Sequence, residues 1–418
     1  MIARRAVTLA VMATTLCAAT VPPQAAASTP QVAASTPQVA APTPQTSATQ
    51  PDIIVSVEPQ PVPAVYVPQD KDERGLWMQM EEEERKLKTS NFVMREAQLN
   101  DYVHRVFCKT VGPECASIRI YLMRTAYFNA NMAPNGAMQI WSGLFLRTRD
   151  EAQLAAVLAH EFAHYKERHS LMLFRQAKAK AASATFLAMF GLVGALFALG
   201  EISALFRFSR EMEARADALS VEMIAKAGYD PMAASRIWEQ IGAEADATAA
   251  ARNTKSRKDK NGGMFASHPP TTERLATLKA LAASIKPMGT PRLNRDEYRA
   301  ALAPMWASLI DDQVKLNDFG ATEYLIGFLA VDGWTPSLNY ARGELYRARG
   351  RPEDLTAAAG FYRQATQGAD APVEAWRGLG LSLLRTGAQA EGQAALKDYL
   401  SRRPDASDKT MIAMLAGV

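Results

Sequence analysis

The segment that most restricts how this chain can fold is VLAHEFAHYKERHS, residues 157–170, which holds three of the five histidines. His160 and His164 are four residues apart in the run RDEAQLAAVLAHEFAHYKERH, which we expect to be one helix with acidic residues in its first turn. On a helix this spacing places both imidazoles on one face, where both can reach a single zinc ion. Histidines on so apolar a helix would be costly to bury without partners, so we interpret them as metal ligands.

The residue between them has a second role in this pattern. Glu161 is about 100° around the helix from His160, where its carboxylate can reach a water bound to the metal. One class of zinc peptidases takes its third ligand from H-E-x-x-H-x-x-G-x-x-H, but Glu167 and Ser170 stand where the glycine and the last histidine should be. His169 comes one place early and is expected to face elsewhere. The sequence therefore excludes that class.

The third ligand is expected from a later helix, FSREMEARADALSVEMIAKAG. Glu213 and Asp217 are four residues apart on one face, so Glu213 can bind the metal while Asp217 accepts the N–H of a ligand histidine. Glu211 competes as the ligand, but it has no carboxylate four residues further on. Arg210 precedes Glu213 by three residues and is expected to balance the acidic cluster.

Four motifs in this order carry a resemblance: NANMAPNGAMQIWSGLF, HEFAH, SREMEARAD and SHPPTTERL. Over about residues 75–285 the chain resembles the zinc metallopeptidase family of the CAAX prenyl protease and the HtpX heat-shock protease, peptidase family M48. The resemblance implies zinc ligands at His160, His164 and Glu213, and a general base at Glu161. It also implies a gluzincin-like fold, mainly α with a small β-sheet at the active-site edge.

His268, in MFASHPPTTERL, follows the charged, glycine-ended stretch KSRKDKNGG and precedes two prolines. A histidine on a stiff hinge beside a loop is well placed to enter a cleft. There it can donate to the oxyanion that forms opposite the metal, or it can occupy the open metal position and block the enzyme. The alternative is a surface histidine of a loop. TTERL then begins a helix that Thr271 or Thr272 caps.

The N-terminus predicts export. A basic start, the apolar run AVTLAVMATTLCAAT and the small residues QAAAS have the layout of a signal peptide, residues 1–27, with a second possible cleavage after Ala19. Leu16 before Cys17 argues against lipid attachment at that cysteine. Residues 28–69, rich in Pro, Ala and Thr, are expected to form a linker. A net charge of +4 gives no support to nucleic-acid binding.

Two cysteines remain after signal removal, Cys108 and Cys115 in VFCKTVGPECAS. A close pair in an exported protein predicts a disulfide. Just before the hairpin motif, SIRIYLMR alternates as a strand does, and NANMAPNGAMQIW predicts a hairpin turning at Pro-Asn-Gly. Ordered structure is expected to begin near Trp77, within a peptidase domain that spans residues 70–290.

The last part of the chain changes to paired helices, and residues 295–418 are expected to form an all-α tetratricopeptide-repeat domain. One repeat is marked by Trp376, Leu379, Gly380, Leu383, Leu396, Tyr399 and Pro404. Such repeats bind peptides or partner proteins. The alternative is a plain helical cap on the peptidase domain.

Residues 181–200 are a run of twenty residues without a charge, long enough for a membrane span. A single span would separate Glu213 from His160 and His164, so we expect instead a buried segment or a surface element that touches lipid or unfolded proteins. The signal peptide and the helical repeats resemble the periplasmic branch of this family, which acts in outer-membrane protein quality control. That resemblance implies zinc-dependent endoproteolysis of misassembled envelope proteins in the periplasm, with outer-membrane assembly partners at the repeats. The alternative is a repeat-based chaperone or scaffold with a silent zinc site.

Overall fold

The computed structural model describes residues 66–179, 210–256, 268, 272–285, 289–369 and 371–418. The predicted signal peptide, most of the predicted linker and the apolar run 181–200 lie outside these residues. The described elements are α1 Lys71–Lys88, α2 Ala97–Val111, η1 Gly112–Ser117, β1 Arg119–Met123, β2 Ala130–Met132, β3 Ala137–Trp141, α3 Ser142–Arg147, α4 Glu151–Lys166, α5 His169–Ala179, α8 Arg210–Lys226, α9 Ala233–Ala251, α11 Thr272–Ser284, α12 Arg295–Leu302, η4 Ala303–Met305, α13 Trp306–Val314, α14 Phe319–Leu329, α15 Pro336–Arg349, α16 Pro352–Thr366, α17 Glu374–Arg385, α18 Gln389–Arg402 and α19 Lys409–Ala416.

A single three-stranded sheet is present among the described residues, with strand order β1-β3-β2. β1 pairs with β3 in parallel, and β2 pairs with β3 antiparallel. The predicted strand and hairpin are therefore confirmed. The hairpin turns at Gly136, whose φ of +85° lies in the left-handed region that glycine adopts without strain.

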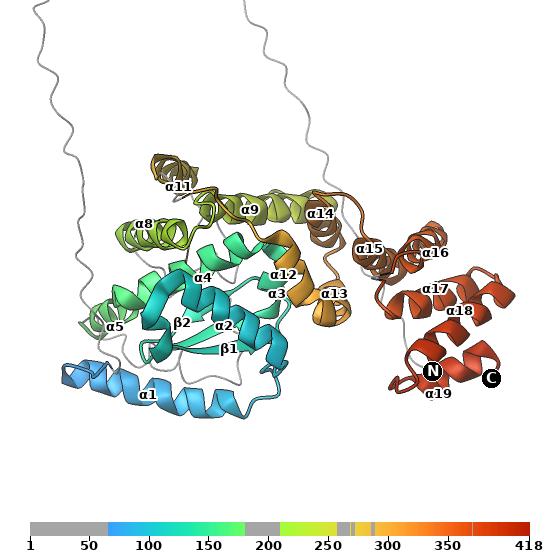
Figure 1. The fold of residues 1–418 in the computed structure, drawn as a ribbon, viewed down its shortest axis with the longest axis horizontal. Coiled ribbons are helices and arrows are strands. Elements are labelled where there is room, and N and C mark those ends of the chain that lie inside the picture. Colours follow the sequence, from blue (N-terminus) through green and yellow to red (C-terminus); the bar gives the residue numbers. More distant parts are fainter. Residues whose placement is uncertain (1–65, 180–209, 257–267, 269–271, 286–288, 370) are drawn as a thin grey trace, which may run out of the picture. The chain divides into compact units, whose positions relative to one another are not determined.

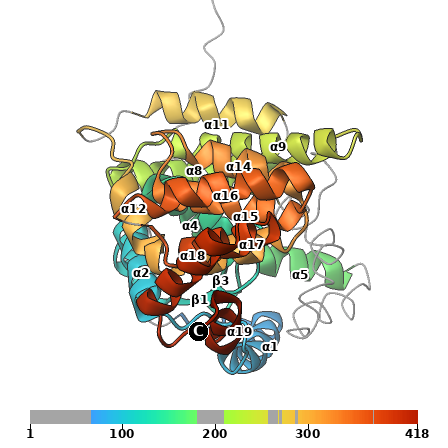
Figure 2. The same ribbon diagram turned by 90° about the vertical axis from the view of Figure 1, so that its right-hand side faces the viewer.

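α4 lies inside the domain, covered by α8 and α9 on one side and by α2 and the sheet on the other (Figures 1 and 2). Its residues from Glu151 to His164 are all buried. This explains why apolar residues surround the helix instead of forming one stripe. The helix begins at Asp150, whose carboxylate accepts a hydrogen bond from the backbone N–H of Gln153.

The first described helix begins earlier than the sequence predicts. α1 starts at Lys71, and the Tyr66 ring before it stacks on Trp77 at 5.5 Å between centroids. The Tyr66 hydroxyl also donates a hydrogen bond to Glu73 at 2.6 Å. Residues 66–69, which we assigned to the linker, thus contact the folded part of the chain.

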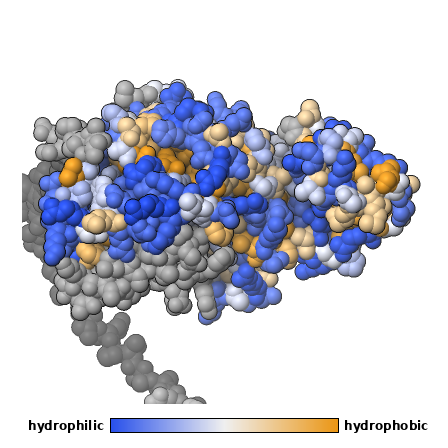
Figure 3. Space-filling view, turned by 90° about the horizontal axis from the view of Figure 1, so that it is seen from below, coloured by the Kyte–Doolittle hydropathy of each residue, from blue (hydrophilic) through white to orange (hydrophobic). Residues whose placement is uncertain are grey.

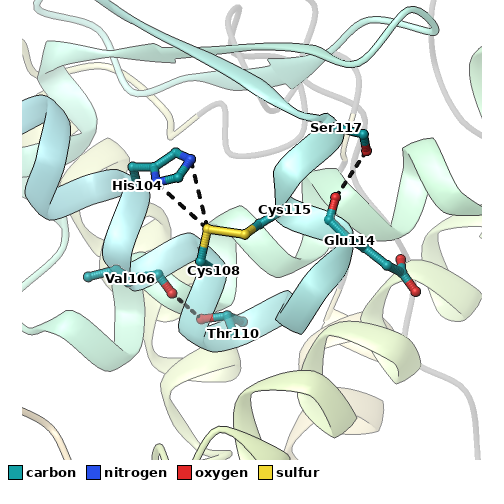
Figure 4. The surroundings of a disulfide bond; sticks show 7 residues. All are labelled: His104, Val106, Cys108, Thr110, Glu114, Cys115 and Ser117. Carbon is teal, nitrogen blue, oxygen red and sulfur yellow. Dashed lines mark hydrogen bonds between the residues drawn. A yellow bond between two sulfur atoms is a disulfide. The ribbon is translucent and has the colours of Figure 1, made fainter. Parts of the chain in front are cut away.

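Cys108 and Cys115 form a disulfide, as the sequence predicts, which links the end of α2 to the turn of η1 (Figure 4). His104, one helical turn before Cys108, lies beside its sulfur (Figure 4). Among all the residues that the structure describes, no helix is both long enough and apolar enough to cross a membrane.

The C-terminal helices pack in successive pairs, α15 on α16 and α17 on α18. Buried residues of these helices belong to the main hydrophobic cluster, whose members lie between Met94 and Ala395 in the sequence. α14 packs on α9, where an added Cβ at Gly320 would lie 2.8 Å from the Ala247 carbonyl oxygen. The paired helices match the predicted arrangement, while their assignment as tetratricopeptide repeats stays a prediction.

Candidate metal centre

Two helices bring the predicted metal ligands together. The Nε2 atoms of His160 and His164 on α4 lie 3.1 Å apart. The Glu213 carboxylate on α8 lies 3.6 Å from Nε2 of His160 and 3.5 Å from Nε2 of His164. Each of these residues and His268 offers one ligand atom, and the four atoms lie within 4.8 Å of one another. All four side chains are buried.

The packing of α8 on α4 decides between the two candidate glutamates. Glu213 faces α4 and is 4% exposed, whereas Glu211, two residues earlier, is exposed to solvent. Residues two apart on a helix cannot face the same neighbour, so only one of the two carboxylates reaches the histidines. The structure brings Glu213 to the cluster and leaves Glu211 outside it.

The donor set fits a bound cation. Two imidazole nitrogens and one carboxylate are the ligands of catalytic zinc sites, which keep a further position open. Oε1 of Glu161 is buried and has no hydrogen-bond partner among the residues that the structure describes. A buried polar atom without a partner is costly, and a water held beside a cation would supply the missing hydrogen bond. The same Glu161 oxygen lies 3.7 Å from Nε2 of His268.

Each of these two histidines has a polar atom close to its other ring nitrogen. Nδ1 of His160 lies 3.1 Å from Oδ1 of Asp217, so Asp217 lies beside one of the two predicted ligand histidines. Nδ1 of His164 lies 2.9 Å from Nδ1 of His169. His169 is not among the four residues that offer ligand atoms, but its contact with His164 was not predicted.

The counter-charge of the acidic cluster is Arg274 on α11, not Arg210. The Arg210 side chain is 89% exposed and lies 3.7 Å from Glu273. Arg274 is buried, lies 2.8 Å from Oε2 of Glu213, and stacks its guanidinium 4.4 Å from the Trp238 ring centre. The structure does not meet the expectation for Arg210, because this side chain is turned to solvent and pairs with Glu273 instead of Glu213.

Burial and charge act differently on the carboxylates. Burial raises the pKa of Glu161 to about 8. Burial also disfavours the charged form of Asp217, but the charge and hydrogen bonds of Arg274 lower its pKa to about 2. The pKa of His164 is held well below its usual range by burial and by the neighbouring histidines. The low pKa of His164 favours its neutral imidazole, the form that binds a metal.

Two buried residues at the site were missed by the sequence analysis. Arg274 lies in the quoted segment TTERL, but a charged residue at a helix start is ordinarily solvated. Trp238 on α9 packs beside His160 at 6.2 Å between ring centres. Nothing in its local sequence distinguishes it from a core tryptophan.

This arrangement, with the H-E-x-x-H residues on a buried helix and a glutamate from the next packed helix, defines a metallopeptidase. Residues 94–282 match the sequence profile described as Peptidase family M48, so this part of the chain is similar to the peptidase domain of that family.

Three relatives show how far the similarity extends. The putative β-barrel assembly-enhancing protease of Vibrio cholerae is 26% identical over 280 residues, 63% of this chain and 54% of that protein. The mitochondrial metalloendopeptidase OMA1 of Schizosaccharomyces pombe is 32% identical over 152 residues, 34% of this chain and 44% of the relative. The β-barrel assembly-enhancing protease of Escherichia coli is 24% identical over 223 residues, 49% of this chain and 43% of the relative. The chain thus spans about half the length of these proteins.

Proposed function

We propose that this metallopeptidase is a zinc-dependent endopeptidase that cleaves misfolded or misassembled envelope proteins. The observation that carries the proposal is the convergence of His160, His164 and Glu213 around one buried point. The Glu161 oxygen beside them accepts no hydrogen bond from the described residues. Zinc prefers this combination of nitrogen and oxygen ligands.

The chemistry follows from where the side chains lie. His160 and His164 would hold the ion through Nε2, and Glu213 through its carboxylate. When bound, zinc supplies the Lewis acidity that makes water nucleophilic near neutral pH. Glu161 takes the proton as water attacks the peptide carbonyl, and later delivers it to the leaving amine. A nearby cation favours the ionised form of Glu161, which burial alone disfavours.

We assign His268 a regulatory or catalytic part in this reaction. Its Nδ1 lies 2.8 Å from Oε1 of Glu213 and 3.3 Å from Nε2 of His160, among the ligand atoms themselves. This position supports the blocking role more than the oxyanion role. If His268 blocks the site, His268→Ala raises peptidase activity at least about tenfold at unchanged zinc content. A similar fall indicates the oxyanion role, and unchanged kinetics contradict both.

The substrate class rests on the sequence and on the names of the relatives. Two of the relatives are named for β-barrel assembly, and the N-terminus has the layout of a signal peptide, which favours the periplasm. The C-terminal helices would supply partner contacts. Figure 3 shows hydrophobic patches among hydrophilic side chains on one face of the described surface. Exposed apolar residues at the last helix are Met411, Met414, Leu415 and Val418.

The alternative is a repeat-based chaperone or scaffold whose metal site is silent. The intact Glu161 argues against it, because a silent site has no need of a base. Zinc analysis of the purified protein, with hydrolysis of an unstructured peptide before and after chelation, distinguishes the two. The proposal predicts activity that is lost on chelation and restored by zinc. Zinc-loaded protein without hydrolysis, also in the His268→Ala variant, would favour the alternative.

Substrates can then be trapped with Glu161→Gln and identified by mass spectrometry. We expect envelope proteins among those bound by this variant and released or cleaved by the parent. A trap that holds no envelope protein would contradict the substrate class while leaving the metallopeptidase chemistry intact.

A further inference from the structure

The third histidine of the opening motif has a defined place in the structure. His169 is 2% exposed, and its Nδ1 lies 2.9 Å from Nδ1 of His164. Two ring nitrogens at this distance form a hydrogen bond only if one carries the proton and the other a lone pair. The neutral imidazole of His164 must keep the lone pair of Nε2 for a metal, so its proton is on Nδ1. His164 therefore donates and His169 accepts.

This contact requires the chain to leave the helix. On a continuous helix, His169 would lie about 140° around the axis from His164 and would point away from it. Instead α4 ends at Lys166, and Arg168 adopts a left-handed φ of 55°, which is uncommon for a residue that is not glycine. The turn brings His169, the first residue of α5, back beside His164.

Residues on and just before α1 hold this turn in place. Arg168 lies 3.2 Å from Oε1 of Glu73 on α1, and its guanidinium stacks 4.3 Å from the Tyr66 ring centre. Beyond the turn, α5 packs on α1 through a small separate core formed by Leu76, Met80, Leu171 and Phe174. α1 lies outside residues 94–282, which match the family profile. The backbone strain at Arg168 is thus compensated by contacts from a helix that this profile does not include.

We propose that His169 is a positioning residue for metal binding, which accepts the Nδ1 proton of His164 and so aims Nε2 of that ring at the metal. Together with Asp217 at His160, it gives both ligand histidines a fixed tautomer and orientation. The inference rests on the proposed zinc site.

Two conservative variants distinguish a hydrogen bond from simple packing. His169→Asn places its side-chain oxygen close to where Nδ1 of the imidazole lies, whereas His169→Gln places it near Nε2. The measurement is the zinc dissociation constant of the full chain, from competition with a chromophoric chelator. His169→Ala and His169→Gln should raise this constant about 10- to 100-fold, and His169→Asn by less than about threefold. His104→Ala, the loss of an exposed histidine, is the control and should change nothing.

Thermal unfolding of the metal-free variants separates binding from folding, since the inference predicts similar midpoints for Asn and Gln at this position. It is overturned if all three variants bind zinc as the parent does. It is also overturned if Asn weakens binding as much as Ala, because packing alone would then explain the effect. A parent protein that binds no zinc would instead refute the proposed function.

Discussion

Arg274 donates two hydrogen bonds to Asp217, from Nε to Oδ2 at 2.7 Å and from NH2 to Oδ1 at 2.8 Å. The same carboxylate faces Nδ1 of His160. One guanidinium on α11 therefore holds the carboxylate that faces His160, a predicted metal ligand on α4, and it neutralises two buried carboxylates at once.

This relationship predicts that lysine cannot replace the arginine. Arg274→Lys loses the planar two-point contact with Asp217 and the stacking on Trp238. We expect the zinc dissociation constant to rise about tenfold or more, as for other partners of metal-bound histidines. Arg210→Lys, an exposed residue on α8, is the matched control. Equal zinc affinity of both variants would show that the planar contact of Arg274 with Asp217 does not support metal binding.

The choice between the two glutamates of α8 can be tested in the same assay. Glu213→Gln removes the only charged oxygen ligand among the three predicted metal ligands, so the purified variant should contain little zinc. Glu211→Gln changes an exposed side chain two residues away and should keep the zinc content of the parent. The reverse pattern would mean that α8 presents its other face to α4.

The helical spacing alone was enough to predict that His160, His164 and Glu213 lie together. Residues four apart on α4 and again on α8 must share a face, and the burial of those faces followed from their apolar neighbours. The positions of Arg274 and His169 depend on contacts that local sequence does not encode. We expected the helix to continue to His169, whereas it ends at Lys166 because α1 holds a left-handed turn at Arg168.

Acid should lower the stability that the protein gains from Glu84, a buried carboxylate away from the metal site. Burial disfavours the charged form of Glu84, yet hydrogen bonds from Arg119 and Tyr121 lower its pKa from the ordinary 4.5 to about 2. A lowered folded-state pKa means that folding favours the ionised form. Its contribution to stability is therefore fully present above about pH 4.5 and is lost as the pH falls towards 2.

The corresponding variant is Glu84→Gln, measured by urea unfolding. At pH 7 the free energy of unfolding should fall by about 2 kcal/mol, since charged hydrogen bonds are lost. The difference from the parent should shrink steadily below about pH 4.5, down to pH 2. Glu82→Gln, on the exposed side of α1, is the control. A difference that is the same at pH 7 and pH 3 would refute the ionic origin.

The docking of α14 on α9 predicts opposite effects for two glycines of one helix. Gly320→Ala puts a Cβ 2.8 Å from the Ala247 carbonyl oxygen, so α14 must shift and the protein should lose about 1–3 kcal/mol of stability. Gly327 has open space around its Cα, and Gly327→Ala should instead gain up to about 1 kcal/mol from helix propensity. Calorimetry on both variants measures the difference. Two stabilising substitutions would show that α14 does not pack on α9.

The central claim is that Glu161 is the base of a zinc peptidase, and one paired measurement on Glu161→Gln tests it most directly. Zinc content and the rate of hydrolysis of an unstructured peptide are determined on the same preparation of the full chain. The account predicts the zinc content of the parent, since Glu161 is not a ligand, and a rate at least about a hundredfold lower. Zinc-loaded Glu161→Gln that cleaves the peptide as fast as the parent would contradict it.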